Sequence, residues 1–482
     1  MRNWFPALAC TVLLAACAIP PRTDRPALRD EAPLAGIAAD VSGRWPDADW
    51  WKRYDDPQLD ALEAQALTAA PTLRQAGTRF DAALRAVDIA RAEAGLGSSL
   101  DAQAQRIRLS EHGLIPPQFL GFTWYDQGDL SLGFRYDFDF WGRTRAAVAA
   151  AVDEARAAEA ERSAATLMLT VAVADAYLGW QADRAHVAVA RDAVAILEGQ
   201  RRLSMLRRER GIEPPDVGHD IEARLASARE MQIAYEGAAE VRRAAIAALL
   251  GIAPAQLPQW RERPLPEVDG QLPDDVGIDL LARRPDIAAS RWRVEAALAR
   301  TEQARAAFFP DVSLGAMIGL QSIDLGKLLE AGSRTAAIGP ALHLPLFGNR
   351  TLRATHRAAQ AQLEAAAAAH DAAVVDAARD VSTQSLALAQ LAARRDQRER
   401  QLAAQQELAR IAKARADRGL GDDRSVLAAR ADVLEQQDAA LTLHAQALST
   451  ELALIKALGG GYRLEADPAA TDVAKPARTP LP

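Results

Sequence analysis

The sequence predicts a mainly α-helical chain that carries membrane β-strands and is built as an internal tandem repeat. Three observations support this fold class. Three segments alternate polar and apolar residues with the period of two that a strand with one dry face requires, and a fourth does so less regularly. Two very long segments contain no proline, and several sequence features recur about two hundred residues apart in the same order.

The N-terminus has the composition of an export signal. Arg2 precedes an apolar stretch from Pro6 to Ala16, which is too short to cross a membrane as a mature helix. We therefore expect residues 1–16 to be a signal peptide. Removing them also removes Cys10, so the mature chain keeps one cysteine and cannot form an internal disulfide.

Composition excludes several classes of function. The net charge of −7 and an aromatic content of 5% argue against a nucleic-acid partner. The seven histidines are scattered and form no HExxH or paired ligand spacing, so no metal site is expected. No P-loop or nucleophile elbow is present in the sequence. We therefore expect no cofactor, no catalytic residues and no enzyme activity.

The internal repeat is visible in correspondences that keep the same order along the chain. Pro71 corresponds to Pro285 at an offset of 214, and Gly211 corresponds to Gly419 at an offset of 208. The Trp-Gly pair at 141–142 matches the Phe-Gly pair at 347–348, and the Leu-Gly pair at 250–251 matches that at 458–459. Each unit is expected to run helix, strand pair, very long helix, turn and shorter helix.

The predicted strands have one uniformly apolar face. In residues 129–140 the even positions are all leucine or aromatic, and the strands near 312 and 342 alternate in the same way. We expect these side chains to face lipid: Leu130, Leu132, Phe134, Tyr136, Phe138, Phe140, Val312, Leu314, Ile318, Leu320, Leu342 and Leu344. The strand from Leu100 changes parity between Ala104 and Ile107, which suggests a bulge or bend. Pro340 and Pro345 are expected at bulges or near strand ends.

Four strands do not suffice for a closed membrane barrel. Strands of about 10 to 13 residues rise roughly 33 to 43 Å, enough to cross the hydrocarbon when tilted. An open sheet in lipid would leave edge amides unpaired at several kcal/mol each. Three chains would supply twelve strands and close the wall. The alternative is a soluble β-sandwich face, or two amphipathic hairpins packed on helices.

The proline-free segments predict helices far longer than a globular domain needs. A helix from Arg143 to about Arg210 would extend roughly 100 Å. Within it a coiled-coil seam is formed by residues spaced four, three and four apart: Leu167, Val171, Ala174 and Leu178. Shorter helices over 216–250 and 422–458 would return antiparallel to the long ones, and upstream helices over 72–98 and 286–309 would stack on them. Three chains would then place twelve helical rods below the twelve strands.

These expectations divide the chain as follows: 1–16 signal peptide, 17–49 tether, 50–98 opening segment and first upstream helix, 99–141 first transmembrane β-hairpin, 142–253 long helix, turn and return helix of repeat 1, 254–284 connection, 285–309 upstream helix of repeat 2, 310–347 second transmembrane β-hairpin, 348–462 long helix, turn and return helix of repeat 2, and 463–482 C-terminal tail.

Several motifs, in order along the chain, resemble those of a known family. They are WWKRYDDPQLDALEAQAL from Trp50, VADAYL from Val173, ARRPDIAAS from Ala282, ARAAFFPDVSLGAMIG from Ala304 and LGDDRSVLAARADVL from Leu420. The chain resembles TolC-like outer membrane efflux proteins, specifically NodT-type outer membrane lipoproteins of tripartite, RND-type efflux pumps. The sequence LAAC, ending at Cys17, resembles a bacterial lipobox, which implies that Cys17 is the lipid attachment site and carries acyl chains such as palmitate.

The resemblance implies a homotrimer: a 12-stranded outer-membrane β-barrel with four strands per chain, continuous with a 12-helix periplasmic α-barrel. Its implied function is a passive conduit that carries small toxic compounds from the periplasm to the exterior and so supports multidrug resistance. The implied partners are a periplasmic adaptor (membrane fusion protein), an inner-membrane transporter of the RND type and outer membrane lipid. Contacts with the first two would open the helical tip.

The periplasmic tip is expected at the two helix turns. Three copies of the acidic residues of the second turn would form a ring, offset by neighbouring arginines. The candidate gate and tip residues are Asp417, Asp422, Asp423, Arg415, Arg418, Arg424, Arg207 and Arg208. Ordinary solvation of a turn would also explain these charges.

Two alternatives remain open at this point. A type I secretion outer membrane channel would use the same architecture to pass polypeptides. A lipid-anchored periplasmic coiled-coil scaffold would keep its hairpins in water and would conduct no ions.

Overall fold

A computed structural model describes residues 19–34, 43–112, 117–270, 272–273, 276–345 and 349–463. The predicted signal peptide, Cys17 and most of the predicted C-terminal tail lie outside these residues. The chain divides into two compact units, each described here by itself. The sheet unit comprises Phe80–Ala158 and Ser290–His370 with the described part of the tether up to Leu28, and the helical unit comprises Arg29–Arg79, Glu159–Ala289 and the chain from Asp371 onward.

The element order confirms the tandem repeat. The first copy contains α3 (Pro71–Glu93), β1 (Gly97–Arg108), β2 (Trp124–Phe138), α5 (Arg143–Glu209) and α6 (Pro215–Leu250). The second contains α8 (Pro285–Ala306), β3 (Asp311–Ser322), β4 (Arg334–His343), α9 (Asn349–Asp417) and α10 (Asp423–Ala457). The connections hold η1 (Trp50–Tyr54), α2 (Pro57–Ala69), α4 (Pro117–Leu120), η2 (Pro254–Gln256), α7 (Val276–Arg283), η3 (Leu325–Lys327) and η4 (Ala331–Ser333).

Each long helix is followed by one of the glycines that recur in the repeat. Gly211 and Gly419 follow α5 and α9 with φ of 68° and 71°, a left-handed conformation that costs little only for glycine. Gly251 follows α6 with φ of 69°, and its backbone N–H returns to the carbonyls of Ala247 and Ala248. Proline-free sequence therefore gives helices of 67 and 69 residues, each closed by a glycine.

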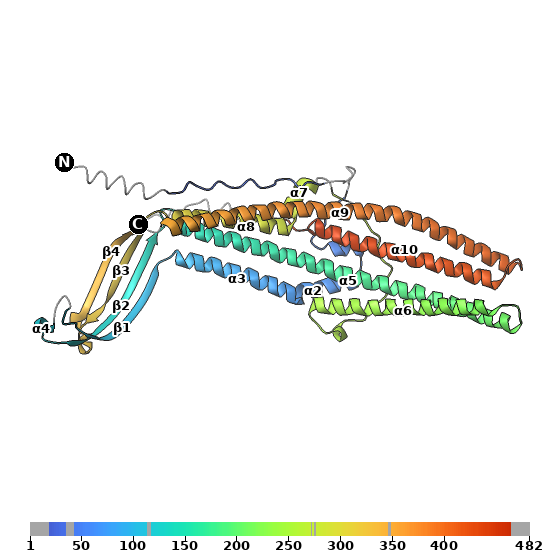
Figure 1. The fold of residues 1–482 in the computed structure, drawn as a ribbon, viewed down its shortest axis with the longest axis horizontal. Helices are drawn as coiled ribbons and strands as arrows, with labels where there is room; N and C mark the ends of the chain where they lie inside the picture. The colour runs from blue at the N-terminus through green and yellow to red at the C-terminus, as the bar shows by residue number, and fades with distance from the viewer. Residues whose placement is uncertain are drawn as a thin grey trace. The chain divides into compact units, whose positions relative to one another are not determined.

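The four strands form one antiparallel sheet in the order β1-β2-β3-β4 (Figure 1). The pairing register is continuous throughout: Leu100 lies opposite Leu132, which lies opposite Ile318, which lies opposite Ala336. Even-numbered residues of all four strands therefore share one face of the sheet, and odd-numbered residues share the other.

Three predictions about strand detail need correction. The bulge expected near Ala104 is absent, because every residue of β1 pairs with β2 without interruption. Strand β2 ends at Phe138, so Phe140 lies in a bend just beyond the strand. Strand β4 ends at His343, which leaves Leu344 outside it. Pro340 pairs in register near the end of β4, an edge strand of this sheet, where a missing N–H donor is tolerated.

The core of the helical unit surrounds the middle of α5. Trp50, Trp51 and Tyr54 of η1 pack with α2, α6 and the buried α5 residues Val173 and Tyr177. Three of the four predicted seam residues are buried, since Leu167, Ala174 and Leu178 are each less than a tenth exposed, and Val171 is partly buried. One window of α5 is long and apolar enough to cross a membrane by length and composition, but half of it is buried in the protein. Helix packing therefore accounts for its apolar composition.

Candidate functional site

The apolar face of the sheet is the first candidate site. Ten of the twelve predicted lipid-facing residues lie on it, all at even positions of β2, β3 and β4, whereas Phe140 and Leu344 lie beyond the strand ends. Among these ten, Ile318 is 59% exposed and Leu342 is 70% exposed, and Ile338 on the same face is 77% exposed. An exposed face this apolar is typical of a surface that meets lipid or another protein. Lipid contact of the individual residues stays a prediction.

The opposite face of the sheet is polar or small. It carries Asp101, Gln103 and Asp129 in the middle of β1 and β2, and half of its positions in β3 are glycine or serine. Arg135 and Asp137 form an ion pair of 2.9 Å along β2, with both side chains more than half exposed. In β2, β3 and β4, one largely apolar face and one largely hydrated face give the alternation of a membrane barrel wall around an aqueous lumen.

Both outer strands of the sheet have an edge without a partner within the described chain. β1 and β4 each pair on one side only. Because neighbouring strands alternate in direction, β1 and β4 run in opposite directions. The β1 edge of a second copy therefore has the polarity needed to continue the antiparallel ladder at β4.

Aromatic side chains gather at both ends of β2. At the helix end Tyr136 packs on Phe138 with ring centroids 5.1 Å apart. Just beyond it Trp141 stacks on Phe309 at 4.6 Å and donates its indole N–H to the Pro310 carbonyl at 2.9 Å. At the far end Trp124 is 51% exposed. Aromatic belts of this kind mark the two interfaces of a membrane-spanning wall.

The two long turns form the second candidate site, which lies entirely in the helical unit. Glu213, in the turn between α5 and α6, has a side chain only 4% exposed. Its carboxylate accepts a hydrogen bond of 3.2 Å from Arg424 of α10 and lies 3.7 Å from the Arg207 guanidinium of α5. Arg207 also lies 3.6 Å from Asp422. One buried carboxylate thus connects a turn of the first repeat with the start of α10 in the second.

The predicted tip residues have different environments. Asp422 caps α10 by accepting the Ser425 backbone N–H at 3.0 Å, and this hydrogen bond lowers the pKa of its carboxyl group. Asp417 pairs with Lys413 one turn earlier at 3.1 Å. Four further predicted residues are exposed, and within the described residues they form no ion pair: Asp423, Arg208, Arg415 and Arg418.

Sequence reasoning missed Glu213, which is the most buried charge of the tip. The prediction rested on the acids of the second turn, whereas Glu213 lies in the first turn, directly before the Pro214-Pro215 pair. A single acid held next to two prolines in a turn was the available signal, because the prolines restrict the backbone around it.

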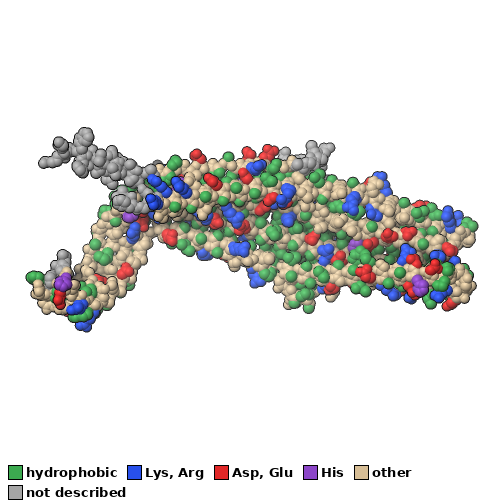
Figure 2. Space-filling view, viewed as in Figure 1, with side chains coloured by type: hydrophobic (Ala, Val, Ile, Leu, Met, Phe, Trp, Pro, Cys, Tyr) green, Lys and Arg blue, Asp and Glu red, His purple; other side chains and the backbone are tan. Residues whose placement is uncertain are grey.

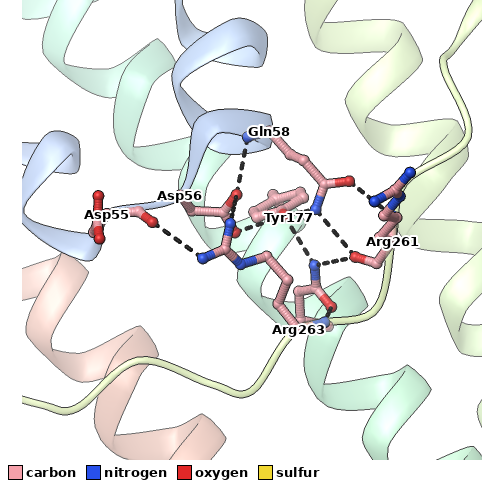
Figure 3. Close-up of polar contacts among 7 residues, drawn as sticks. Asp55, Asp56, Gln58, Tyr177, Arg261 and Arg263 are labelled. Atoms are coloured by element: carbon pink, nitrogen blue, oxygen red, sulfur yellow. Dashed lines mark hydrogen bonds and ion pairs between the residues drawn. The ribbon is translucent and has the colours of Figure 1, made fainter.

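A polar network in the helical unit holds the connection after α6 against α2 and α5 (Figure 3). Asp56 caps α2 through the Gln58 N–H at 2.9 Å and accepts the Tyr177 hydroxyl at 2.8 Å. Gln58 donates to the Arg261 carbonyl at 3.0 Å and accepts the Arg261 N–H at 2.7 Å. Burial and the Asp56 hydrogen bond raise the pKa of the Tyr177 hydroxyl, which therefore stays protonated as a donor.

Glu63 of α2 is a buried acid of a different kind. Its side chain is fully buried, and neither carboxyl oxygen has a hydrogen-bond partner among the described residues. Burial, with a smaller effect of Asp60, raises its pKa to about 9. The folded chain therefore holds Glu63 in its neutral form at pH 7.

Neither charge nor ligand clustering suggests a catalytic centre. On the face drawn in Figure 2, acidic and basic side chains are interspersed along the helices without a large patch of one sign. Within the part of the chain that the structure describes, no group of three or more His, Cys, Asp or Glu residues is arranged to hold a metal ion.

Comparison with known proteins agrees with this architecture. The sequence profile described as outer membrane efflux protein matches residues 62–252 and 278–460, one segment in each repeat. The chain belongs to the outer membrane efflux protein family. Multidrug resistance outer membrane protein MdtP of Escherichia coli (strain K12) is 30% identical over 466 residues, which are 95% of this chain and 96% of that protein. Protein MdtQ of Escherichia coli O6:H1 is also 30% identical, over 96% of this chain and 99% of its own.

Solved structures extend the likeness to three dimensions. The outer membrane protein VceC of Vibrio cholerae has a TM-score of 0.77 and 34% identity, covering 86% of this chain and 100% of that one. The outer-membrane channel OprN has a TM-score of 0.82 and 26% identity, covering 92% and 99%. This efflux protein is therefore an outer membrane channel, with a membrane β-domain and a long helical domain.

The motifs that carry the family resemblance have structural roles. Asp56 and Tyr177, from two of them, meet in the network of Figure 3. In a third, Arg284 pairs with Asp286 at 2.6 Å and donates to the Ala457 carbonyl at the end of α10. In a fourth, Phe309 supplies the stacking partner of Trp141. The Trp141–Phe309 stack joins the two repeats, whereas the other contacts lie within one repeat or attach the segment that precedes it.

Proposed function

We propose that this efflux protein is the exit duct of a tripartite efflux pump and carries small toxic compounds passively from the periplasm to the exterior. Three copies close a twelve-stranded barrel above a twelve-helix tube. A periplasmic adaptor and an inner-membrane transporter of the RND type open the helical tip, and the energy comes from that transporter. The chain itself performs no catalysis.

The observation that carries the proposal is the sheet, with one apolar face and two free antiparallel edges. A single chain in lipid would leave the backbone groups of both edges unpaired, at several kcal/mol each. Copies related by rotation pair β4 of one chain with β1 of the next and remove every edge. The odd-numbered polar face then lines the lumen.

The contact among Glu213, Arg207 and Arg424 supports a closed tip held by ion pairs. It joins parts of both repeats within one chain, so opening the tip by separating them requires breaking it. Partner contacts that favour the separated arrangement would shift the population toward the open state. The acids of the second turn would then surround the mouth as a ring of charge.

Cys17 is the proposed lipid attachment site, which would anchor the tether in the periplasmic leaflet of the outer membrane. The support is the LAAC sequence that ends at Cys17 after a short apolar segment. The 30% identity to MdtP and MdtQ, both named multidrug resistance outer membrane proteins, supports small toxic compounds over the polypeptides of a type I secretion channel.

Two neighbouring substitutions in β4 test the barrel. Ile338 lies on the apolar face and Ala337 on the opposite face, at the same height in the sheet. Arginine at 338 costs about 2–4 kcal/mol in lipid, whereas arginine at 337 enters the aqueous lumen. We expect Ile338→Arg to abolish trimers and single-channel conductance in planar bilayers, and Ala337→Arg to retain both. A monomeric, non-conducting wild-type protein would support the periplasmic scaffold instead.

A further inference from the structure

Three arginines at the start of α9 have no role in the duct described so far. Arg350, Arg353 and Arg357 are all exposed, and within the described residues none of them forms an ion pair or a side-chain hydrogen bond. An exposed arginine without a partner is unremarkable singly, but three on adjacent turns concentrate positive charge.

The three side chains share one stripe of the helix. At about 100° per residue their positions fall within a sector of roughly 60°. The other side of this segment is buried: His356 and Ala359 are each less than a tenth exposed, and His356 packs edge-on against Phe308 beyond α8. Packing thus fixes the orientation of α9 and leaves the arginine stripe facing away from α8.

No acid in the surrounding sequence neutralises these charges. From residue 331 to 363 the chain contains four arginines and neither Asp nor Glu. The matching start of α5 differs, because Arg143 pairs with Asp311 at 3.3 Å and Arg145 with Asp139 at 3.2 Å. At the repeat offset of 206, Arg350, Arg353 and Arg357 correspond to Thr144, Ala147 and Ala151.

The stripe begins where the apolar face of the sheet ends. Helix α9 starts six residues after the last residue of β4, on the helix side of the sheet that carries Trp141 and Phe309. Aromatic residues at this position mark the edge of the hydrocarbon layer. From Arg350 to Arg357 the helix rises about 10 Å, comparable with the roughly 5–8 Å of headgroup layer beyond the hydrocarbon.

We propose that Arg350, Arg353 and Arg357 bind the phosphate groups of anionic phospholipids in the periplasmic leaflet of the outer membrane. The inference rests on the proposed barrel, because only a membrane-spanning sheet brings a leaflet to this level. Guanidinium groups bind phosphate oxygens with two parallel hydrogen bonds, and basic clusters beside a membrane segment attract anionic lipid. The described part of the tether contacts the last turn of α8, where Arg305 donates a hydrogen bond to the Pro20 carbonyl at 3.0 Å.

An acidic protein segment is the other chemistry that three arginines would attract. Continuity with the lipid-facing surface favours phospholipid, since the stripe directly follows strands whose apolar side chains remain 59–77% exposed at Ile318 and Ile338. A membrane supplies anionic groups all around a trimer, so each of the three copies of the stripe would be occupied.

The test uses the full-length trimer in vesicles of phosphatidylcholine containing spin-labelled phosphatidylglycerol or spin-labelled phosphatidylcholine. Electron paramagnetic resonance measures how strongly each labelled lipid associates with the protein surface. We expect the wild-type protein to prefer phosphatidylglycerol by about three-fold or more at low salt, and high salt to reduce the preference. In the triple variant R350Q/R353Q/R357Q the two lipids should associate equally.

The matched control is R74Q/R202Q/R394Q, which removes three exposed arginines of the helical unit that also lack ion pairs among the described residues. It should keep the wild-type preference, and single-channel conductance should be unchanged in both variants. An unchanged preference in R350Q/R353Q/R357Q overturns the proposal. Two other results would also overturn it. Altered ion selectivity without a change in lipid preference would place the stripe in the lumen. Loss of adaptor binding alone would indicate an acidic protein partner. Failure of the wild-type protein to insert would instead reject the barrel itself.

Discussion

Replacing Glu213 by glutamine removes the one carboxylate that lies between Arg207 and Arg424. The substitution preserves the size of the side chain and its ability to accept a hydrogen bond, but it removes the charge. Both arginines keep their positive charge and lose their shared counter-ion, so the contact between the α5–α6 turn and α10 weakens. We expect the closed tip to become less stable relative to the open tip.

The burial of the three side chains sets the magnitude. Glu213 is 4% exposed, whereas Arg207 is 32% and Arg424 is 50% exposed. Removing one partner of a fully buried pair costs about 3–5 kcal/mol, and an exposed pair contributes about 1 kcal/mol or less. A half-exposed arrangement lies between these limits, at about 1–2 kcal/mol. Because 1.4 kcal/mol is a factor of ten, the ratio of closed to open channels should fall about ten-fold for each copy of this contact that opening breaks.

Single-channel recording in planar bilayers measures this ratio as the fraction of time spent open. Glu222→Gln is the matched control, because it removes the same charge from the exposed surface of α6, where Glu222 lies 3.8 Å from His219. The open fraction of Glu213→Gln should be at least about ten times that of the wild-type channel, and Glu222→Gln should behave as the wild type does. Equal open fractions in all three proteins would refute the idea that the ion pairs of Glu213 hold the tip closed.

Three further predictions concern single groups. The double variant Asp422→Asn with Asp423→Asn keeps the cap of α10, because Asn caps a helix as well as Asp does. We expect it to change the conductance or the cation preference of the channel in planar bilayers, because it removes the ring of negative charge. Identical single-channel traces would show that the two acids do not line the mouth. The pKa of Glu63 is raised to about 9, so the unfolded chain loses this proton near pH 4.5 while the folded chain keeps it, and stability falls as pH rises from about 4.5 to 9. Glu63→Gln should remove this pH dependence and stabilise the protein by about 3 kcal/mol at pH 7. Measured by circular dichroism, the melting temperature of the variant should fall less between pH 5 and pH 8 than that of the wild type. An equal fall in both proteins would show that Glu63 is charged in the folded chain. Cys17→Ser should prevent incorporation of labelled palmitate in cells, and retained label would place the lipid elsewhere.

The elements with strong local signals were predictable from the sequence. The absence of proline predicted α5 to within a residue of its observed bounds and predicted a second long helix in the matching part of repeat 2. Alternation defined the faces of β2 and β3, because one parity is uniformly apolar. The prediction failed for β1, where the change of parity at Ile107 suggested a bulge. Pairing with β2 keeps β1 regular and places Ile107 on the hydrated face.

The contacts of the candidate site were less predictable, since they depend on residues far apart in the chain. Glu213 and Arg424 are 211 positions apart, and no local sequence pattern predicts their contact. Asp56 was recognised only as part of a motif, and its hydrogen bond to Tyr177 became visible once α2 lay beside α5. Period and composition determine which face of an element is buried, but they do not determine which polar side chains meet across it.

The charges of this efflux protein break the symmetry that its backbone preserves. At the offset of 208, Glu213 corresponds to Gly421 and Arg424 corresponds to Asp216. A second repeat that copied the first would carry glutamate at position 421 and aspartate at position 424, and Glu213 would then face an acid in place of Arg424. The arginine stripe follows the same rule, because Arg353 corresponds to Ala147 in the first repeat. Gly421→Glu together with Arg424→Asp gives the second turn the charges of the first. This double variant should leave trimers and helix content unchanged, but the tip should lose the ion pair between Glu213 and residue 424. The repeated backbone builds the tube, and the charge differences between the repeats hold it closed.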